Sequence, residues 1–284
     1  MNCLPHSELE SFAEFLIDGL KAELYLTPKP GLVDLYDNGS HKDLSPAIML
    51  QSIRFLRDYL SELCIVLQRN HEIEELIAVG KRAEERMLKQ LGTNCHRGGI
   101  FLCGLLLTAR SHCTSNNPRQ LQKTVAKSAK EFFLAGAPLK SKGQQTRERF
   151  QIGGIIEEAT LGLPTLFDIA LPTLSDCSAA EEHRIFLTMA RVMQCLEDTT
   201  TMHRCGQTGL ARLKKAGKQL EMLILSGDEP TPFLFQLNRD FKTMNLTMGG
   251  VADLLGISFG YYSYLQQTFS KKSLPSLGAT NSGL

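Results

Sequence analysis

The chain has 284 residues, of which 43% are apolar and 21% are charged, with a formal net charge of +1 and a pI near 7.6. This size allows one large hydrophobic core, and the near-neutral charge argues against a basic surface of the kind that binds nucleic acid. No apolar run reaches the about 20 residues that span a bilayer, and residues 1–18 are acidic and amphipathic, unlike a signal peptide, so we expect a cytoplasmic protein.

Hydrophobic periodicity predicts helices along nearly the whole chain and no strand. Ser7 and Glu10 fit a capping box that opens a helix, whose apolar face carries Leu9, Phe12, Leu16 and Leu20. Ser45-Pro46 and Asn117-Pro118 each place a capping side chain before a proline at the first helical position. Pro172 and Pro230 are expected beyond helix ends. Further helices are predicted over residues 73–91, 155–170, 179–196, 209–225 and 250–269.

These segments predict an all-α fold, a single-domain multi-helix bundle with its site built from polar turns between helices. We expect the domain to cover residues 1–270 and residues 271–284 to form a disordered tail. Residues 136–154 are rich in Lys, Arg and Gln and fit either a mobile lid over phosphates or an exposed variable loop.

The first polar turn, residues 27–43, combines two prolines and two glycines with a high density of charged side chains. Carboxylates in such a loop can bind a divalent ion, and Lys or His can contact phosphate oxygens. A solvated connector would also contain Pro, Gly, Asp and Asn as turn formers. The polar candidates in this turn are Lys29, Asp34, Asp37, Asn38, His41, Lys42 and Asp43.

A second polar turn, residues 92–99, leads into the unbroken apolar run of residues 100–107. Free backbone N–H groups at a helix N-terminus attract anions, and glycines allow a phosphate to approach closely. Asn94, His96 and Arg97 together exceed what a simple helix cap requires, so we favour a binding site over a cap.

Three later segments have a similar composition, with polar residues beside glycines at predicted helix starts or ends. An acid at a helix start is also favoured by the helix dipole alone, and paired acids such as Glu157-Glu158 mostly face solvent. The candidates that these segments add are Glu158, Asp198, His203, Arg204, Asn245 and Asp253.

Eight cysteines form no C-x-x-C pair, which argues against a zinc ribbon or a thioredoxin-type site and favours reduced core residues. Cys95-His96 and His203 with Cys205 lack the regular spacing of zinc ligands. G-x-x-x-x-G-K-[ST] and G-x-G-x-x-G are also absent from the sequence.

Five ordered blocks make the chain resemble a known family, the triphosphoribosyl-dephospho-CoA synthases of citrate lyase and malonate decarboxylase. The first block, LTPKPGLVD at residues 26–34 with NGSHKD at 38–43, is the most specific. The others are residues 94–101, 153–162, 198–206 and 245–255.

Some positions depart from the family pattern. Ile156 stands where an arginine is usual, and Thr247-Met248 replaces Ser-Pro. The Glu157-Glu158 pair and the spacing from Asp198 to Gly209 are more similar to the malonate decarboxylase branch.

The resemblance implies transfer of the 5-triphosphoribosyl group of ATP to the 2′-hydroxyl of 3′-dephospho-CoA, with release of adenine. The product would be the prosthetic-group precursor for an acyl carrier protein. Breaking an N-glycosidic bond builds positive charge on the ribose, so carboxylates near the anomeric carbon are expected.

The candidate residues receive roles from this reaction. Mg²⁺ on the triphosphate would be held by Asp34, Asp37, Asp43 and Asp253. Catalysis would involve Glu158, Asp198, His203 and His41. Substrate contacts would come from Lys29, Asn38, Lys42, Asn94, His96, Arg97, Arg204 and Asn245.

Two rival functions stay open on the sequence. A nucleotide hydrolase on the same scaffold would release adenine without a ribosylated product, and a non-catalytic protein would bind nucleotide or CoA without turnover. We expect no nucleic-acid or membrane partner, and exposed apolar helix faces are compatible with a homodimer.

Overall fold

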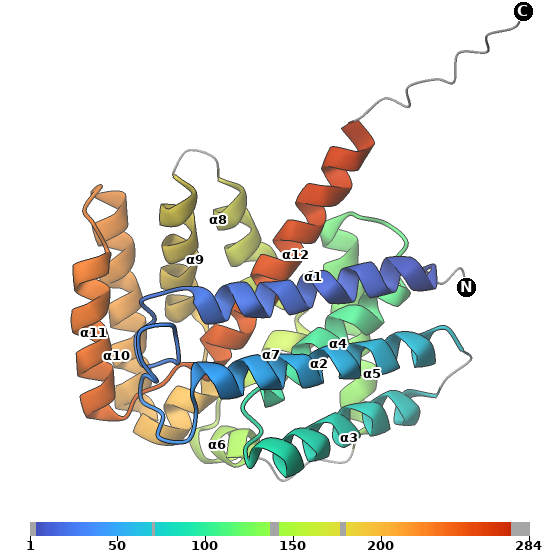
Figure 1. Cartoon of the computed structure of the whole chain (residues 1–284), viewed down its shortest axis with the longest axis horizontal. Coiled ribbons are helices and arrows are strands. Elements are labelled where there is room, and N and C mark those ends of the chain that lie inside the picture. The colour runs from blue at the N-terminus through green and yellow to red at the C-terminus, as the bar shows by residue number, and fades with distance from the viewer. Residues whose placement is uncertain (1–3, 70–71, 137–141, 177–179, 274–284) are drawn as a thin grey trace, which may run out of the picture.

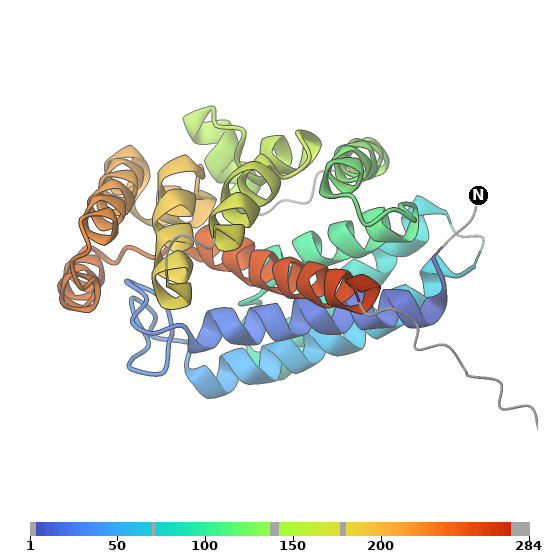
Figure 2. The ribbon, with the colours of Figure 1, turned by 90° about the horizontal axis from the view of Figure 1, so that it is seen from above.

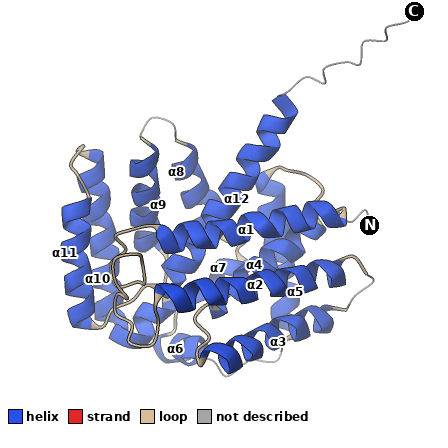
Figure 3. Ribbon diagram, viewed as in Figure 1, coloured by secondary structure: helices blue, strands red, loops and turns tan. Residues whose placement is uncertain are grey.

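The computed structural model describes residues 4–69, 72–136, 142–176 and 180–273. The predicted all-α class is confirmed, because every regular element in these ranges is a helix (Figure 3). None of these helices is long and apolar enough to cross a membrane. The elements in chain order are α1 (His6–Tyr25), α2 (Pro46–Leu67), α3 (Ile73–Leu91), α4 (Arg97–Ser111), α5 (Pro118–Ala135), α6 (Lys142–Phe150), α7 (Gly154–Thr160), the π-helical η1 (Thr165–Ala170), α8 (Leu171–Ser175), α9 (Glu181–Cys195), α10 (Thr199–Leu225), α11 (Thr231–Met244) and α12 (Gly249–Ser273).

Helix α12 forms the centre of the bundle. It lies between the layer of α1 and α2 and the helices η1, α8 and α9 (Figure 2). The crossing of α1 and α12 depends on glycine, since a Cβ on Gly19 would lie 2.3 Å from the backbone oxygen of Gly256. A Cβ on Gly260 would likewise lie 2.4 Å from the backbone oxygen of Phe15. This close antiparallel contact brings the last turn of α1 beside the first turn of α12.

The long polar turn between α1 and α2 lies at one end of the bundle, next to α10 and α11 (Figure 1). Gly31 in this turn has φ +72°, and a Cβ there would lie 2.4 Å from the backbone oxygen of Leu246. The chain therefore needs glycine at this position to pass close to the segment that leads into α12.

Several predicted helix starts are confirmed. Ser45 caps α2 by accepting a hydrogen bond from the backbone N–H of Ile48, and Asn117 caps α5 through the N–H of Arg119. The capping box at Ser7 is wrong, because α1 begins at His6 after Pro5 and has no side-chain cap.

Other boundaries differ from the prediction. The predicted helix over residues 155–170 is divided into α7 and η1, because Gly162 and Leu163 have positive φ values of 86° and 54°. Pro172 lies in the first turn of α8, where a proline needs no N–H partner, and not beyond a helix end. Helix α10 starts at Thr199 and is kinked at Gly206.

Helix α12 continues to Ser273, so the predicted tail at residues 271–284 overlaps it, and residues 274–284 lie outside the described residues. In the predicted lid over residues 136–154, positions 137–141 also lie outside them. The rest of that segment includes α6, which packs against α10.

Candidate functional site

Four buried polar side chains and one half-buried aspartate lie where α1, the first polar turn, α4, α10 and α12 meet. We name this set the polar cluster; its buried members are Glu23, Lys29, His96 and Asp198, and its half-buried member is Asp253. At its base, the ammonium Nζ of Lys29 donates to Oε1 of Glu23 at 2.6 Å, with both side chains almost fully buried. Burial raises the pKa of Glu23, and Lys29 opposes that rise. The predicted phosphate donor Lys29 is thus engaged by a carboxylate of α1.

Asp34 organises the first polar turn. Its Oδ2 accepts the backbone N–H of Lys29 at 2.8 Å, and its Oδ1 accepts those of Tyr36 and Asp37 at 2.7 and 3.0 Å. These three bonds engage both carboxylate oxygens of a residue that is 1% exposed. Asp34 therefore shapes the turn, while its predicted role as a metal ligand stays a prediction.

The same turn is fastened to α11. Asn238 accepts the backbone N–H of Gly31 at 2.9 Å through Oδ1 and donates to Oδ2 of Asp37 at 3.1 Å. Lys242 donates to the same Oδ2 at 2.7 Å. Burial raises the pKa of Asp37, but the contacts with Lys242, the Gly39 N–H and Asn238 outweigh it and leave the pKa lowered.

Three of the blocks found in the sequence meet at His41. Its Nε2 lies 2.9 Å from Oγ1 of Thr247, and its Nδ1 lies 3.3 Å from the guanidinium of Arg204. Arg204 also donates to the backbone oxygen of Ser40 at 2.8 Å and to Oδ1 of Asn245 at 3.3 Å. Burial, and then Arg204, lowers the pKa of His41 to about 4, so this imidazole is neutral at pH 7.

The start of α4 also faces the polar cluster. His96 is buried and its Nδ1 hydrogen-bonds the hydroxyl of Ser52 on α2. Burial, and then the charge of Lys29, lowers the pKa of His96 to about 4. A Cβ on Gly98 would lie 2.0 Å from Oδ2 of Asp253. The absence of a side chain at Gly98 therefore makes room for the carboxylate of Asp253 on α12.

Asp253 has the most perturbed environment of the polar cluster. Burial raises its pKa well above the ordinary value, the negative charges of Glu23 and Asp198 raise it further, and the backbone N–H of Gly99 opposes the rise. Its side chain nevertheless keeps some exposed surface. A carboxyl group of raised pKa with access to solvent has the properties of a general acid or base.

Asp198 joins two helix starts. Its Oδ1 accepts the N–H of Thr201 in α10 at 2.8 Å, and its Oδ2 accepts the N–H of Val251 in α12 at 2.9 Å. The pKa of Asp198 is raised by burial, against which these N–H groups act. The N-terminal ends of α4, α10 and α12 thus lie around the polar cluster, and their dipoles favour anions there.

Two predicted catalytic residues lie apart from this centre. Oε1 of Glu158 accepts the N–H of Thr165 at the start of η1 at 2.8 Å, and burial raises the pKa of its carboxyl. His203 is exposed on α10, with Nδ1 3.5 Å from the hydroxyl of Thr146 in α6. Their roles stay predictions, and the described contacts link neither of them to the polar cluster.

The remaining candidates lie nearer to solvent. Asn38, Lys42 and Asp43 are exposed in the first polar turn, with Oδ1 of Asp43 4.0 Å from Nδ1 of His41. Oε2 of Glu84 on α3 pairs with Nε of Arg97 at 3.1 Å and accepts from Nδ2 of Asn94 at 3.3 Å. The described contacts join none of these side chains directly to the polar cluster.

Within the described residues, no three His, Cys, Asp or Glu side chains gather as they would to hold a metal ion by themselves. The oxygen donors of Asp253 and Asp43 nevertheless fit Mg²⁺, which often binds through one or two carboxylates plus substrate phosphates. The described cysteines, at positions 64, 95, 103, 113, 195 and 205, are free thiols.

Sequence reasoning missed Glu23, Ser52, Asn238 and Thr247. Glu23 lies three residues after Leu20 and so falls on the buried face of α1, where an acid is a signal of a polar partner. Asn238 belongs to α11, a helix that was not predicted. Met248, one of the residues that depart from the family pattern, is fully buried and belongs to the hydrophobic core.

Comparison with known proteins shows which family the chain belongs to. Residues 9–273 match the family model described as ATP:dephospho-CoA triphosphoribosyl transferase. A protein of Pseudomonas paraeruginosa named "Probable 2-(5''-triphosphoribosyl)-3'-dephosphocoenzyme-A synthase" is 32% identical over 88% of this chain and 90% of its own length. The synthase of that name in Pectobacterium atrosepticum is 29% identical, with 86% of each chain covered.

Protein CitXG of Haemophilus influenzae is 28% identical over 91% of this chain and 61% of its own length. No solved structure matches the chain. These names do not separate the malonate decarboxylase branch from the citrate lyase branch, so that assignment stays a prediction. The matches confirm the resemblance seen in the five blocks: the chain belongs to the ATP:dephospho-CoA triphosphoribosyl transferase family.

Proposed function

We propose that this protein transfers the 5-triphosphoribosyl group of ATP to the 2′-hydroxyl of 3′-dephospho-CoA and releases adenine. The observation that carries the proposal is the meeting of three helix N-termini with the carboxyl groups of Asp198 and Asp253. Helix N-termini suit a triphosphate, and carboxylates suit a ribose that gains positive charge. Neither feature alone would favour this reaction over simple phosphate binding.

In the proposed step, the bond between the ribose anomeric carbon and N9 of adenine breaks, and a bond forms between that carbon and the acceptor oxygen. The hydroxyl loses a proton and the departing adenine gains one, so the transfer is balanced. Asp253 is our candidate for taking the hydroxyl proton, because its carboxyl has a raised pKa and partial exposure. Asp198 is a positioning residue, since two backbone N–H groups hold it.

The neutral imidazoles of His41 and His96 would serve as hydrogen-bonding groups and not as fixed charges at pH 7. Arg204, beside the first polar turn, and Arg97, at the start of α4, would supply permanent positive charge for phosphate oxygens. Mg²⁺, bound through Asp43 together with the substrate, would offset the charge of the triphosphate, which leaves the Asp253 carboxyl to take the proton.

The product would serve as the prosthetic-group precursor for an acyl carrier protein. We assign it to malonate decarboxylase and not citrate lyase on the Glu157-Glu158 pattern. Reconstitution with each carrier protein in the presence of its own transferase distinguishes these branches.

Incubation with ATP, Mg²⁺ and 3′-dephospho-CoA, with free adenine and the mass of the CoA product followed together, tests the transfer. Adenine formed in step with a triphosphoribosyl adduct supports the proposal. Adenine without the adduct would mean a hydrolase, and ATP binding without either product would mean a binding protein.

A further inference from the structure

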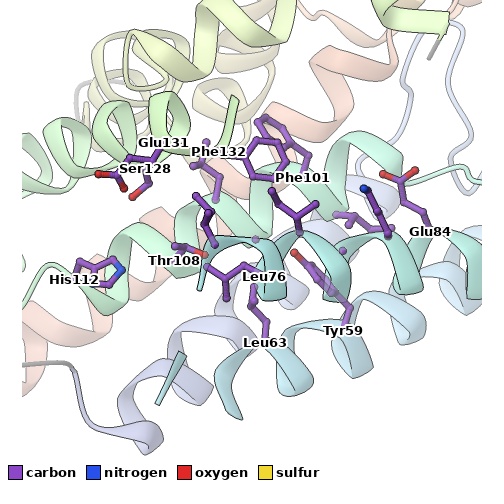
Figure 4. A pocket seen from close by; sticks show the side chains of 17 residues that line it. Tyr59, Leu63, Leu76, Glu84, Phe101, Thr108, His112, Ser128, Glu131 and Phe132 are labelled. Atoms are coloured by element: carbon purple, nitrogen blue, oxygen red, sulfur yellow. The ribbon is translucent and has the colours of Figure 1, made fainter. Parts of the chain in front are cut away.

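A second feature lies beside the polar cluster: a cavity of about 310 Å³ between α2, α3, α4 and α5 (Figure 4). Its wall is mainly apolar and includes Leu63, Leu76, Phe101 and Phe132. The volume falls at the lower end of the range for ligand sites, and a mostly apolar wall with a few polar groups is typical of them. The proposed transfer chemistry uses none of these side chains.

The cavity is elongated along the helices. Its lining residues run along α4 from Ile100 to His112, the residue that follows this helix, and along α3 from Ile73 to Glu84. These spans correspond to about 16 to 18 Å at 1.5 Å per residue. Figure 4 shows Glu84 at one end and His112 at the other. An extended chain can follow such a slot over its whole length, whereas a purine ring would fill only part of it.

A tyrosine hydroxyl faces the slot without a partner among the described residues. The side chain of Tyr59 is 5% exposed, and its hydroxyl makes no hydrogen bond with any residue that the structure describes. A Cβ on Gly104 would lie 2.0 Å from this hydroxyl, so glycine at that position makes room for it. Burial raises the pKa of Tyr59, which keeps the phenol neutral and able to donate. The hydroxyl borders the cavity, so it is free to donate a hydrogen bond to a ligand that carries an acceptor.

At the Glu84 end, the wall of the slot is in contact with residues at the start of α4. Glu84 lines the slot and also contacts Arg97 and Asn94. Ile100, which follows the α4 N-terminus at Gly98 and Gly99, is the first α4 residue of the wall. A ligand that lies in the slot therefore has its polar end beside the start of α4.

We propose that this slot holds the pantetheine arm of 3′-dephospho-CoA, with the diphosphate beside Arg97. The identity of the ligand rests on the proposed function. The arm is a long chain of methylene and methyl groups interrupted by two amides, which matches an apolar slot with a free donor at Tyr59 and a few other polar groups, such as the hydroxyls of Thr108 and Ser128. The acceptor ribose, on the other side of the diphosphate, then lies toward the polar cluster.

Gly80→Leu tests the assignment, because Gly80 lines the slot and a Cβ there meets only the Tyr59 hydroxyl, at 4.0 Å. Leucine also favours a helix more than glycine does, so folding is not threatened. Displacing two or more buried methylene groups at about 0.8 kcal/mol each should weaken binding about tenfold or more. Ala78→Leu adds the same side chain to α3 outside the slot wall and is the matched control.

The measurements are titration calorimetry of the full chain with pantetheine alone and with ATP, and KM for each substrate. We expect Gly80→Leu to weaken pantetheine binding and raise the KM for 3′-dephospho-CoA, with ATP affinity unchanged and Ala78→Leu like wild type. Tyr59→Phe, which removes one hydrogen bond, should weaken pantetheine binding about fivefold.

Wild-type pantetheine affinity in Gly80→Leu, weakened ATP binding instead, or no pantetheine binding by the wild type would each overturn the assignment. The slot assignment and the proposed transfer reaction can be rejected independently of each other. Pantetheine binding that is sensitive to Gly80→Leu, without any triphosphoribosyl product, would retain the slot and reject the transfer reaction. Product formation without pantetheine binding would retain the reaction and reject the slot.

Discussion

The buried pair of Lys29 and Glu23 gives the strongest test of how the polar cluster is held together. Lys29→Met keeps most of the side-chain volume but removes the ammonium that lies 2.6 Å from Oε1 of Glu23. The carboxylate of Glu23, with a side chain that is 4% exposed, is then left without its counter-charge. Removing one partner of a buried ion pair costs about 3–5 kcal/mol of folding free energy.

Urea unfolding at pH 7, with the single variants and the double variant Glu23→Gln/Lys29→Met, measures this effect. The expected loss corresponds to a fall in Tm on the order of 10 °C for a chain of this size. The double variant should recover most of the loss, because it leaves no unpaired buried charge. Glu23→Gln alone should also destabilise, since it leaves the Lys29 ammonium buried and unpaired.

The pH dependence supplies an independent check. The pKa of Glu23 is already raised in the folded protein and should rise further when Lys29 is replaced. An acid with a raised pKa binds more protons folded than unfolded, so its contribution to stability falls as pH rises above the unfolded pKa. The deficit of Lys29→Met should therefore be smaller at pH 5 than at pH 8. A deficit under about 1 kcal/mol, or one that the double variant fails to reduce, would refute this account of the pair.

Three further results are expected. Asp253→Asn should lower the rate of adenine release at least about 100-fold, because the proposed base is lost, and a wild-type rate would exclude Asp253 as the base. The same change should raise the Tm of the ligand-free protein, because burial and the charge of Glu23 raise the pKa of this carboxyl and so disfavour its charged form. Asn238→Ala should cost about 1–3 kcal/mol in urea unfolding, since the buried N–H of Gly31 loses its acceptor, and Thr243→Ala, at an exposed position of the same helix, is the control. The stability advantage of wild type over His41→Asn should shrink as pH falls from 6.5 toward 4, because the folded pKa of His41 is depressed to about 4; an advantage constant with pH would contradict that depression.

The helices were predictable where local signals decide them. Ser45-Pro46 and Asn117-Pro118 carry the cap and the first helical residue together, and residues 73–91 show a clear apolar face, so these elements are confirmed. The break near Gly162 was not visible, because Leu163 adopts a positive φ that no sequence pattern signals. Helix α11 escaped prediction since it follows closely after Pro230 and has only a short apolar face.

The candidate site was predictable as a set of segments but not as an arrangement. His41, Arg204 and Asn245 were chosen from separate blocks, and the structure brings them into contact. Which carboxylate oxygens of these acids accept hydrogen bonds depends on partners far away in the sequence, as Lys242 shows by donating to Asp37. Asp34 and Asp43 look equivalent in the sequence, yet one is buried with three backbone donors and the other is exposed.

The glycine pairs of the blocks acquire a physical explanation from these contacts. Gly98 and Gly99 open α4 against the carboxylate of Asp253, and a Cβ on Gly250 would lie 3.0 Å from Oδ2 of Asp198. A glycine pair in one block therefore makes room for the acid of another, and this close contact holds acids beside helix N-termini. The same contact explains why the sequence suggested phosphate cradles, since glycines at a helix start admit any anionic oxygen. At Gly98 the oxygen beside the glycine is Oδ2 of Asp253. A phosphate bound near the start of α4 would therefore lie next to Asp253 and not in direct contact with Gly98.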